Sequence, residues 1–150
     1  MLRFFGKILY MMFKKLKIKE TAHNFIVLAI TTADDDYYLV WNLNNALSLN
    51  LNRTEHPMLK KEIPEGESIS YFNCVCDETK LEYSLIGNKY DKFKLFPQLA
   101  GVDFVLKISG NLTNEKINQI TGMVRSVKGV TACINLNVKK TPSLGILQRI

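Results

Sequence analysis

The stretch from Phe96 to Asn111, FPQLAGVDFVLKISGN, constrains the fold more than any other part of this chain. Pro97 fixes its own φ and biases the residue before it toward an extended conformation, and Gly101 permits a sharp backbone turn. After that turn, apolar and polar residues alternate with a period of two, which predicts a half-buried strand. The apolar set is Val102, Phe104, Leu106 and Ile108, and the opposite set contains Asp103 and Lys107. The stretch therefore predicts a loop that runs directly into a strand.

A helix and a second strand are expected next. Thr113 is a suitable N-cap, Gly129 is placed to end the helix, and apolar residues recur between them at spacings of three and four. These apolar residues are Ile117, Ile120, Val124 and Val127. From Val130 to Val138 alternation returns, with Asn135 and Asn137 among the polar positions, so a strand with one wet face is expected. A helix between two strands favours a parallel, right-handed unit.

The first half of the chain predicts a similar unit and then a hairpin. Phe25 to Ile30 is a short, continuously apolar run, as in a central strand covered on both faces, fully or in part. The acids Asp34 to Asp36 precede a helical pattern, and we expect them to cap that helix rather than bind a metal. Trp41 on this helix is expected to pack in the core. A short strand over residues 48–53, a long loop over 54–68 and an antiparallel hairpin over 69–76 and 81–86 follow.

Together these elements predict an α+β domain with two helices on one face of a mostly antiparallel sheet. The arrangement is ferredoxin-like with an inserted hairpin, and Val127 to Val130 is similar to the end of ACT-type regulatory domains, which is a fold-level analogy. Strand alternation places several polar side chains on the sheet face away from the helices, and we expect that face to be open to a second copy. These side chains are Asp103, Lys107, Asn135 and Asn137.

The same central stretch carries a family resemblance. The positions concerned are Phe96, Pro97, Gln98, Val102, Asp103 and Phe104. Their order and spacing resemble the signature of the IPExxxVDY family, small bacterial proteins of uncharacterised function, with Phe, Gln and Phe in place of Ile, Glu and Tyr. A competing match runs from Ile63 to Tyr71, but the continuation VLKISG favours the later copy. The resemblance also takes in Asn88 and Lys89 and covers most of the chain after residue 20.

This resemblance implies a binding role for the motif positions and supplies no mechanism. The candidate site residues are Pro97, Gln98, Val102, Asp103, Phe104 and Lys107. Gln98 stands where the family has Glu, so this chain has no carboxylate at that motif position. The residues themselves suggest a structural alternative, in which Asp103 and Lys107 form an ion pair or hydrogen bonds to a loop.

Basic residues concentrate at one end of the chain. Of the formal net charge of +6, residues 1–20 carry +5 and residues 21–150 carry +1. We expect a basic, partly apolar extension over residues 1–20, a single α+β domain over 21–138 and a C-terminal tail over 139–150 whose apolar residues could dock on the domain. The nearly neutral domain argues against nucleic acid as a partner, since nucleic-acid-binding domains normally show a basic stripe.

The extension itself has no segment long enough to span a bilayer. Its longest apolar run, Ile8 to Phe13, is far shorter than the roughly 20 residues required. Drawn as a helix, the extension separates apolar residues from lysines, which fits peripheral contact with an anionic membrane. A disordered tail and a true start at Met11 or Met12 are the alternatives.

Cysteine usage indicates a cytoplasmic protein. Three cysteines are an odd number, and without a convincing signal peptide they indicate reduced thiols. Cys74 and Cys76 share one face of a predicted strand and Cys133 could join them, but neither histidine is near enough in sequence to complete a zinc site. We expect inert thiols, no metal and no other cofactor.

No motif for catalysis stands out. The chain has no glycine-rich phosphate loop, nucleophile elbow or pair of metal-ligand histidines. The sequence therefore favours a small protein without enzymatic activity, which binds a protein partner or its own copy through the sheet face or the loop over residues 54–68. An ACT-like domain that responds to a small molecule is the alternative, and an enzyme whose residues converge only in three dimensions stays open.

Overall fold

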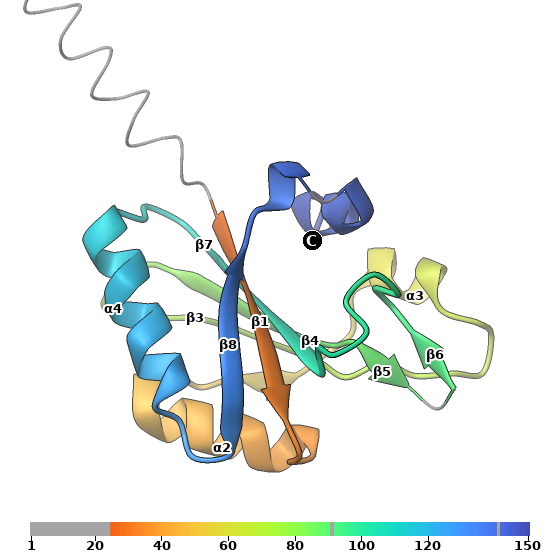
Figure 1. Ribbon diagram of the computed structural model, residues 1–150, viewed down its shortest axis with the longest axis horizontal. Helices are drawn as coiled ribbons and strands as arrows, with labels where there is room; N and C mark the ends of the chain where they lie inside the picture. Colours follow the sequence, from red (N-terminus) through yellow and green to blue (C-terminus); the bar gives the residue numbers. More distant parts are fainter. Residues whose placement is uncertain (1–24, 91, 141) are drawn as a thin grey trace, which may run out of the picture.

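One six-stranded sheet organises the structure, a computed structural model that describes residues 25–90, 92–140 and 142–150 (Figure 1). Its strands are β1 (Phe25–Thr32), β2 (Asn52–Arg53), β3 (Tyr71–Val75), β4 (Glu82–Gly87), β7 (Phe104–Ser109) and β8 (Val130–Leu136). The strand order is β2, β3, β4, β7, β1, β8, and every pairing is antiparallel. A separate small sheet pairs β5 (Lys89–Tyr90) with β6 (Phe93–Lys94). The predicted α+β class with an antiparallel sheet is confirmed.

The centre of the sheet is buried on both faces. Strand β1 lies between β7 and β8, and the side chains of Val27, Leu28 and Ile30 are fully buried. Its register with β7 sets Leu28 opposite Leu106 in one core and Val27 opposite Lys107 on the other face. The continuously apolar run is therefore a central strand, as the sequence predicts.

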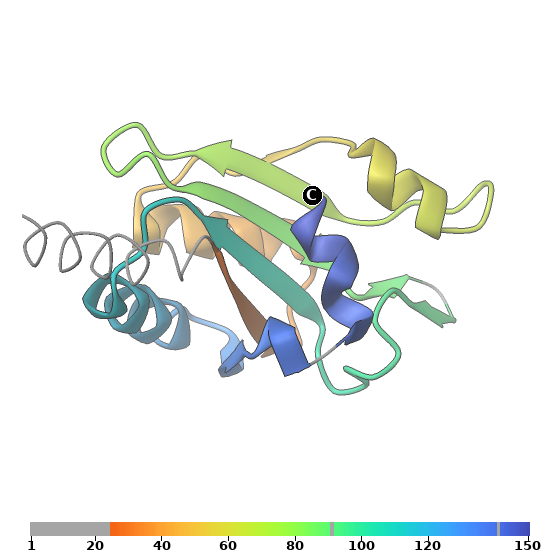
Figure 2. The same cartoon turned by 90° about the horizontal axis from the view of Figure 1, so that it is seen from above.

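Two helices, α2 (Asp36–Leu47) and α4 (Asn114–Arg125), cover the first face of the sheet (Figures 1 and 2). Each begins at a capping side chain that accepts a hydrogen bond from a free backbone N–H group. Asp35 Oδ1 accepts from Tyr38 N–H at 2.8 Å, and Thr113 Oγ1 accepts from Lys116 N–H at 3.2 Å. Both capping predictions are confirmed.

The prediction that Trp41 packs in the core is wrong. Helix α2 buries Leu39, Val40 and Leu43 against the sheet, whereas the Trp41 side chain is 62% exposed. The three aliphatic residues already occupy the inward side of the helix, and Trp41 is turned away from them. The largest apolar side chain of α2 therefore lies on the protein surface and not in the core.

The second face of the sheet is covered over its centre as well, so the prediction of an open face is wrong there, whereas the edge of that face at β8 stays exposed. A short helix, α3 (Pro57–Glu62), lies within the segment predicted as a loop, and a 3₁₀ segment, η2 (Pro142–Gln148), follows the shorter η1 (Val138–Lys140). Leu59 of α3 and Leu144 and Leu147 of η2 are fully buried in a second core with Val27 and Val105. Figure 2 shows α2 and α4 on one side of the sheet and η2 on the other.

The two faces of strand β8 are reversed relative to the prediction, so the residues expected away from the helices lie on the helix side. Its register sets Cys133 opposite Ile30 and Asn135 opposite Leu28, so both lie on the helix side. Ile134 lies opposite Ala29 on the second face and is 58% exposed. Asn135 therefore does not share a face with Asp103 and Lys107. The alternation showed which residues share a face but not which face packs under the helices. Cys133, counted with the polar set, enters the core between the sheet and helices α2 and α4, called the helix-side core.

The unit of β7, α4 and β8 has the predicted strand direction. Both strands are antiparallel to β1, which lies between them, so they run parallel to each other without pairing. At the outer edge of β8, Arg125 Nε from the last turn of α4 donates to the Cys133 carbonyl oxygen at 3.0 Å. The side chain of Arg125 thus occupies one of the acceptors at this edge.

Within the described ranges, none of the helices has the length and apolar character needed to cross a bilayer. The predicted extension over residues 1–20 lies outside the described residues, and its peripheral membrane contact remains a prediction.

Candidate functional site

The residues of the family-like motif lie in a loop that is held by one buried side chain, Asn88. Asn88 is fully buried directly after β4, and its Nδ2 donates to the carbonyl oxygens of Leu99 and Val102, at 2.9 Å each. Its Oδ1 accepts from Phe96 N–H at 2.7 Å, and its backbone N–H and C=O groups bond Asp103 and Leu95. Every polar group of Asn88 is therefore used to fix the loop before β7.

Asp103 joins this loop to the neighbouring strands. Its Oδ2 accepts from Thr32 N–H at 2.9 Å, and its Oδ1 accepts from Lys89 Nζ at 2.8 Å. The Asp103 side chain is only 20% exposed, so both carboxylate oxygens are committed to intramolecular partners. These contacts match the structural alternative for Asp103, with Lys89 in place of Lys107 as its partner.

The other motif positions do not converge on a pocket. Pro97 and Gln98 are exposed on the loop, Val102 is half-buried, and Phe104 points into the helix-side core. Lys107 is buried under the second face, where its Nζ donates to the Ile150 carbonyl oxygen at 2.7 Å and lies 4.9 Å from the centroid of the Phe25 ring. Burial lowers the pKa of Lys107, while the charge of Glu82 raises it to a smaller extent.

The described thiols are spread across the sheet. Cys74 belongs to β3 and Cys76 follows that strand, whereas Cys133 is buried on β8, with three strands between them. In the described part of the chain no three His, Cys, Asp or Glu residues gather where they could hold a metal ion. Burial raises the pKa of Cys74 and Cys133, whereas hydrogen bonds from the Thr79 side chain and backbone lower the pKa of Cys76.

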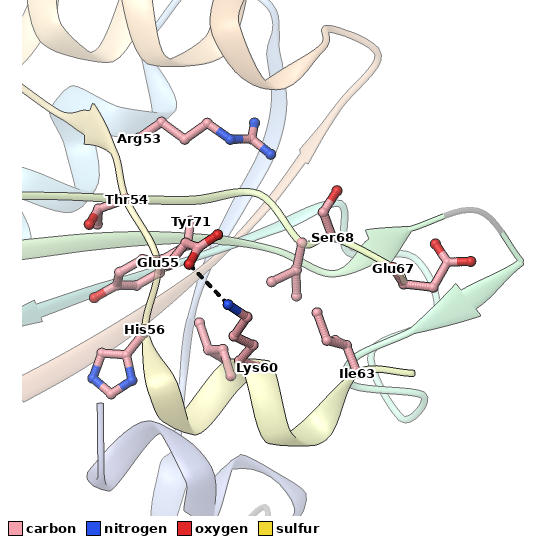
Figure 3. A pocket seen from close by; sticks show the side chains of 11 residues that line it. Arg53, Thr54, Glu55, His56, Lys60, Ile63, Glu67, Ser68 and Tyr71 are labelled. Carbon is pink, nitrogen blue, oxygen red and sulfur yellow. Dashed lines mark hydrogen bonds and ion pairs between the residues drawn. The ribbon is translucent and has the colours of Figure 1, made fainter. Parts of the chain in front are cut away.

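A cavity of about 90 Å³ lies between α3 and the segment leading into β3 (Figure 3). Leu59, Ile63 and Ile69 contribute apolar walls. Lys60 Nζ and Glu55 Oε2 form an ion pair at 3.2 Å, with side chains that are 70% and 81% exposed. Such exposed pairs are strongly screened by water, so this pair creates little electrostatic potential in the cavity.

His56 beside this cavity has a structural partner on its ring. His56 Nδ1 accepts from Met58 N–H at 3.2 Å and caps α3, and the ring meets Tyr71 edge-on at 5.7 Å. Arg53 also lines the cavity, but its guanidinium pairs with Asp36 at 3.3 Å. The cavity could accept a small molecule, but its geometry does not assemble a nucleophile and a base.

Among the described residues, the outward side of α2 carries an unusual group of exposed aromatic side chains. We call Tyr37, Tyr38, Trp41 and Asn45 the α2 face; the three aromatic side chains are 61%, 41% and 62% exposed, and Asn45 is also exposed. From Tyr37 to Leu47 the helix carries no charged residue. Helix α4, by contrast, exposes Glu115, Lys116 and Arg125, as a solvated helix normally does.

Contacts within the domain hold the aromatic rings of the α2 face. Tyr38 stacks on Trp41 with ring centroids 6.4 Å apart and planes at 25°. Tyr37 meets Phe72 edge-on at 5.7 Å, and the guanidinium of Arg53 lies 5.9 Å from the centroids of both rings. Asp36 anchors Arg53 from the first turn of the helix. The aromatic rings are thus oriented without being buried.

The sequence interpretation missed the α2 face because it placed Trp41 in the core. A usable signal was present, since the eleven residues YYLVWNLNNAL contain more large apolar residues than one inward stripe can take and no charge for the outward side.

Searches among protein-family models, curated proteins and solved structures find no match to this chain.

Proposed function

We propose that this chain is a protein-interaction domain that binds through the α2 face. The observation that carries the proposal is an exposed, uncharged helix surface with Tyr37, Tyr38 and Trp41 at its centre. Tyr, Trp and Arg are enriched where proteins bind each other and dominate the binding energy, whereas charged residues are depleted from interface cores. Exposed aromatic side chains on a helix therefore favour a protein partner.

The orientation of the rings supports this role. Tyr38 and Trp41 are stacked, and Tyr37 is held by Phe72 and Arg53. Side chains that are ordered before binding lose little conformational entropy when a partner arrives. Figure 1 shows α2 at one border of the molecule, and η2 belongs to the core on the other face of the sheet.

The proposal includes a ferredoxin-like framework in the cytoplasm. The order β4, β7, β1, β8 with α2 and α4 on one side supports such a framework, to which β2 and β3 are additions. Within it, the motif positions resembling the IPExxxVDY family would serve mainly to fix the loop around Asn88 and Asp103.

Capture from a native lysate with matched variants tests the proposal. We expect the wild type to retain a protein that Trp41→Lys loses and Met123→Lys keeps, because Met123 is an exposed apolar residue on the other helix, 38% accessible. The retained protein is then identified by mass, purified and titrated against all three forms. If Trp41→Lys retains the same proteins with the same affinity as the wild type, the proposal fails.

A ligand-responsive domain of ACT-like type is the second candidate, and the cavity beside α3 is the observation that favours it. A ligand that binds only the folded state raises the melting temperature. A thermal-shift panel of small metabolites tests this candidate, with Leu59→Phe as the variant that fills the cavity wall. A flat panel would remove the candidate.

A further inference from the structure

The α2 face has its largest side chain near the middle of the helix. Trp41 has five helical residues before it and six after it in α2, with Tyr38 on one side and Asn45 on the other. At about 100° per residue, Tyr38, Trp41 and Asn45 point within roughly 60° of one another and away from the buried Leu43. The rings of Tyr37, Tyr38 and Trp41 therefore occupy the face from its N-terminal end to its middle, and the smaller Asn45 lies toward its C-terminal end.

This arrangement is self-complementary. A two-fold axis brings the same patch of two copies together, so any charge on the patch would meet its own copy nearby. The α2 face has no charge to repel itself. If two α2 helices pack antiparallel near Trp41, Tyr38 lies about 4.5 Å to one side of the centre and Asn45 about 6 Å to the other. Each Tyr38 ring then covers the smaller Asn45 of the other copy.

The ends of the helix also suit an antiparallel pair. The acidic N-terminal end of α2 carries Asp35 and Asp36, and Asp36 is neutralised by Arg53. In an antiparallel pair this end lies beside the C-terminal end of the other helix, and the two helix dipoles oppose each other favourably. A parallel pair would instead bring both acidic ends together.

We infer that the partner of the α2 face is a second copy of this chain, bound with the two α2 helices antiparallel about a two-fold axis near Trp41. This inference rests on the proposed function and names the partner of the same surface. One helix face on each copy is a small contact, and small interfaces are typical of weak, transient association, so we expect a dimer that dissociates on dilution.

Sedimentation velocity across micromolar to submillimolar concentrations tests the inference on the full chain. We expect the wild type and Met123→Lys to convert from monomer to dimer, and Trp41→Lys to dissociate about 30-fold more readily or to stay monomeric. Trp41 is the single tryptophan, so its emission should shift to shorter wavelength as the dimer forms and return on dilution. Circular dichroism checks that Trp41→Lys keeps its fold.

A charge pair tests the antiparallel register. Tyr38→Lys and Asn45→Glu should each weaken the dimer about tenfold or more, because each places an unpaired charge in the contact. The double variant should recover much of the loss, since the introduced lysine of one copy then meets the introduced glutamate of the other at both ends. If the double variant is weaker than either single variant, the antiparallel arrangement is overturned.

Other outcomes separate this inference from the proposed function. A wild type that stays monomeric at every concentration, or a Trp41→Lys variant that dimerises like the wild type, overturns the second copy as partner. If the monomer nevertheless captures another protein in a Trp41-dependent manner, the proposed function stands. A monomer whose emission is already at short wavelength at every dilution would mean that the chain covers Trp41 itself, which also overturns the inference.

Discussion

Asn88 holds the loop before β7 through three hydrogen bonds of its side chain. Its side chain alone bonds the backbone of Phe96, Leu99 and Val102, and it is fully buried. Removing a buried polar side chain leaves its partners without hydrogen bonds, and each such loss costs about 1–3 kcal/mol. The side-chain amide of Asn88 is thus a main support of the loop, beside the contacts of Asp103.

We therefore expect Asn88→Ala to lower the free energy of unfolding by about 3–5 kcal/mol, as measured by urea denaturation. Asn111→Ala is the matched control, because Asn111 is exposed and should change stability by no more than about 0.5 kcal/mol. Equal effects of the two substitutions would contradict the assignment.

The three thiols should react in a defined order. Hydrogen bonds from the Thr79 side chain and backbone lower the pKa of Cys76, whereas burial raises the pKa of Cys133. Since the thiolate is the nucleophile, iodoacetamide near neutral pH should modify Cys76 first and Cys133 last, as read by peptide mass spectrometry. Thr79→Val should slow the modification of Cys76 and leave the rate at Cys74 unchanged. Modification of Cys133 at a higher rate than Cys76 would rule out this order.

At the residue scale, roles that depend on sequence neighbours could be predicted, whereas roles that depend on residues distant in sequence could not. The caps Asp35 and Thr113 depend only on the next turn of helix, and both are confirmed. For Trp41 the sequence held a signal, the excess of apolar residues and the lack of charge on its helix, but how far Leu39 and Leu43 fill the inward side is set by packing on the sheet. The partners of Asn88 lie 8 to 14 residues away, so no spacing rule reveals them.

At the element scale, Gly129 shapes the connection from α4 to β8. Its φ of +90° lies in the left-handed region, and an added Cβ would overlap the carboxylate of Asp34. The helix itself ends earlier, at Arg125, with Ser126 as its C-cap. Gly129 is therefore needed at the turn into the strand, three residues after that cap.

Two glycine substitutions in this region should act in opposite directions. Gly129→Ala should destabilise the protein by about 1–3 kcal/mol from backbone strain alone, with the overlap adding to that cost. Gly122→Ala lies within α4 and meets no atom within 4 Å, so the better helix propensity of alanine should stabilise the protein by about 0.5–1 kcal/mol. Thermal melting measures both; a neutral Gly129→Ala would show that the turn can relax.

Element positions could be predicted better than element faces. The expected strands and helices of the sequence largely exist, because their periodicity is strong. Helix α3 was hidden in a segment with prolines and mixed charge, and only Leu59 enters the core from it. The faces of β8 were assigned in reverse because Cys133, not Ile134, enters the core beside the helices.

At the scale of the whole molecule, one sheet separates two cores that share strands. In β1, Leu28 belongs to the helix-side core and Val27 to the other, and β7 contributes Leu106 and Val105 in the same way. The second core could not be predicted from the sequence, because it brings together Leu59 of α3 and Leu144 and Leu147 of η2, two segments that are far apart in the chain. Damage to either strand therefore affects both cores.

Alkaline pH should weaken the fold through Tyr83. Burial is the main reason that the pKa of Tyr83 is raised to about 12, and the charges of Cys76 and Cys74 contribute to a smaller extent. Its folded pKa lies above the ordinary value, so the stabilisation is present below about pH 10 and is lost as the pH rises toward 12. Urea titrations from about pH 8 to 12 should show a loss for the wild type that exceeds that of Tyr83→Phe by up to about 3 kcal/mol. Parallel curves would contradict this role.

The hydrogen bond from Arg125 to the Cys133 carbonyl oxygen limits the pairing of further strands with the edge strand β8. Strand β8 is an edge of seven residues without a charge or proline, VTACINL, and such edges readily template fibrils. By occupying the Cys133 carbonyl oxygen, the guanidinium blocks the ladder in the middle of that strand. A strand of another chain would therefore have to displace Arg125 before it could pair along the whole of β8.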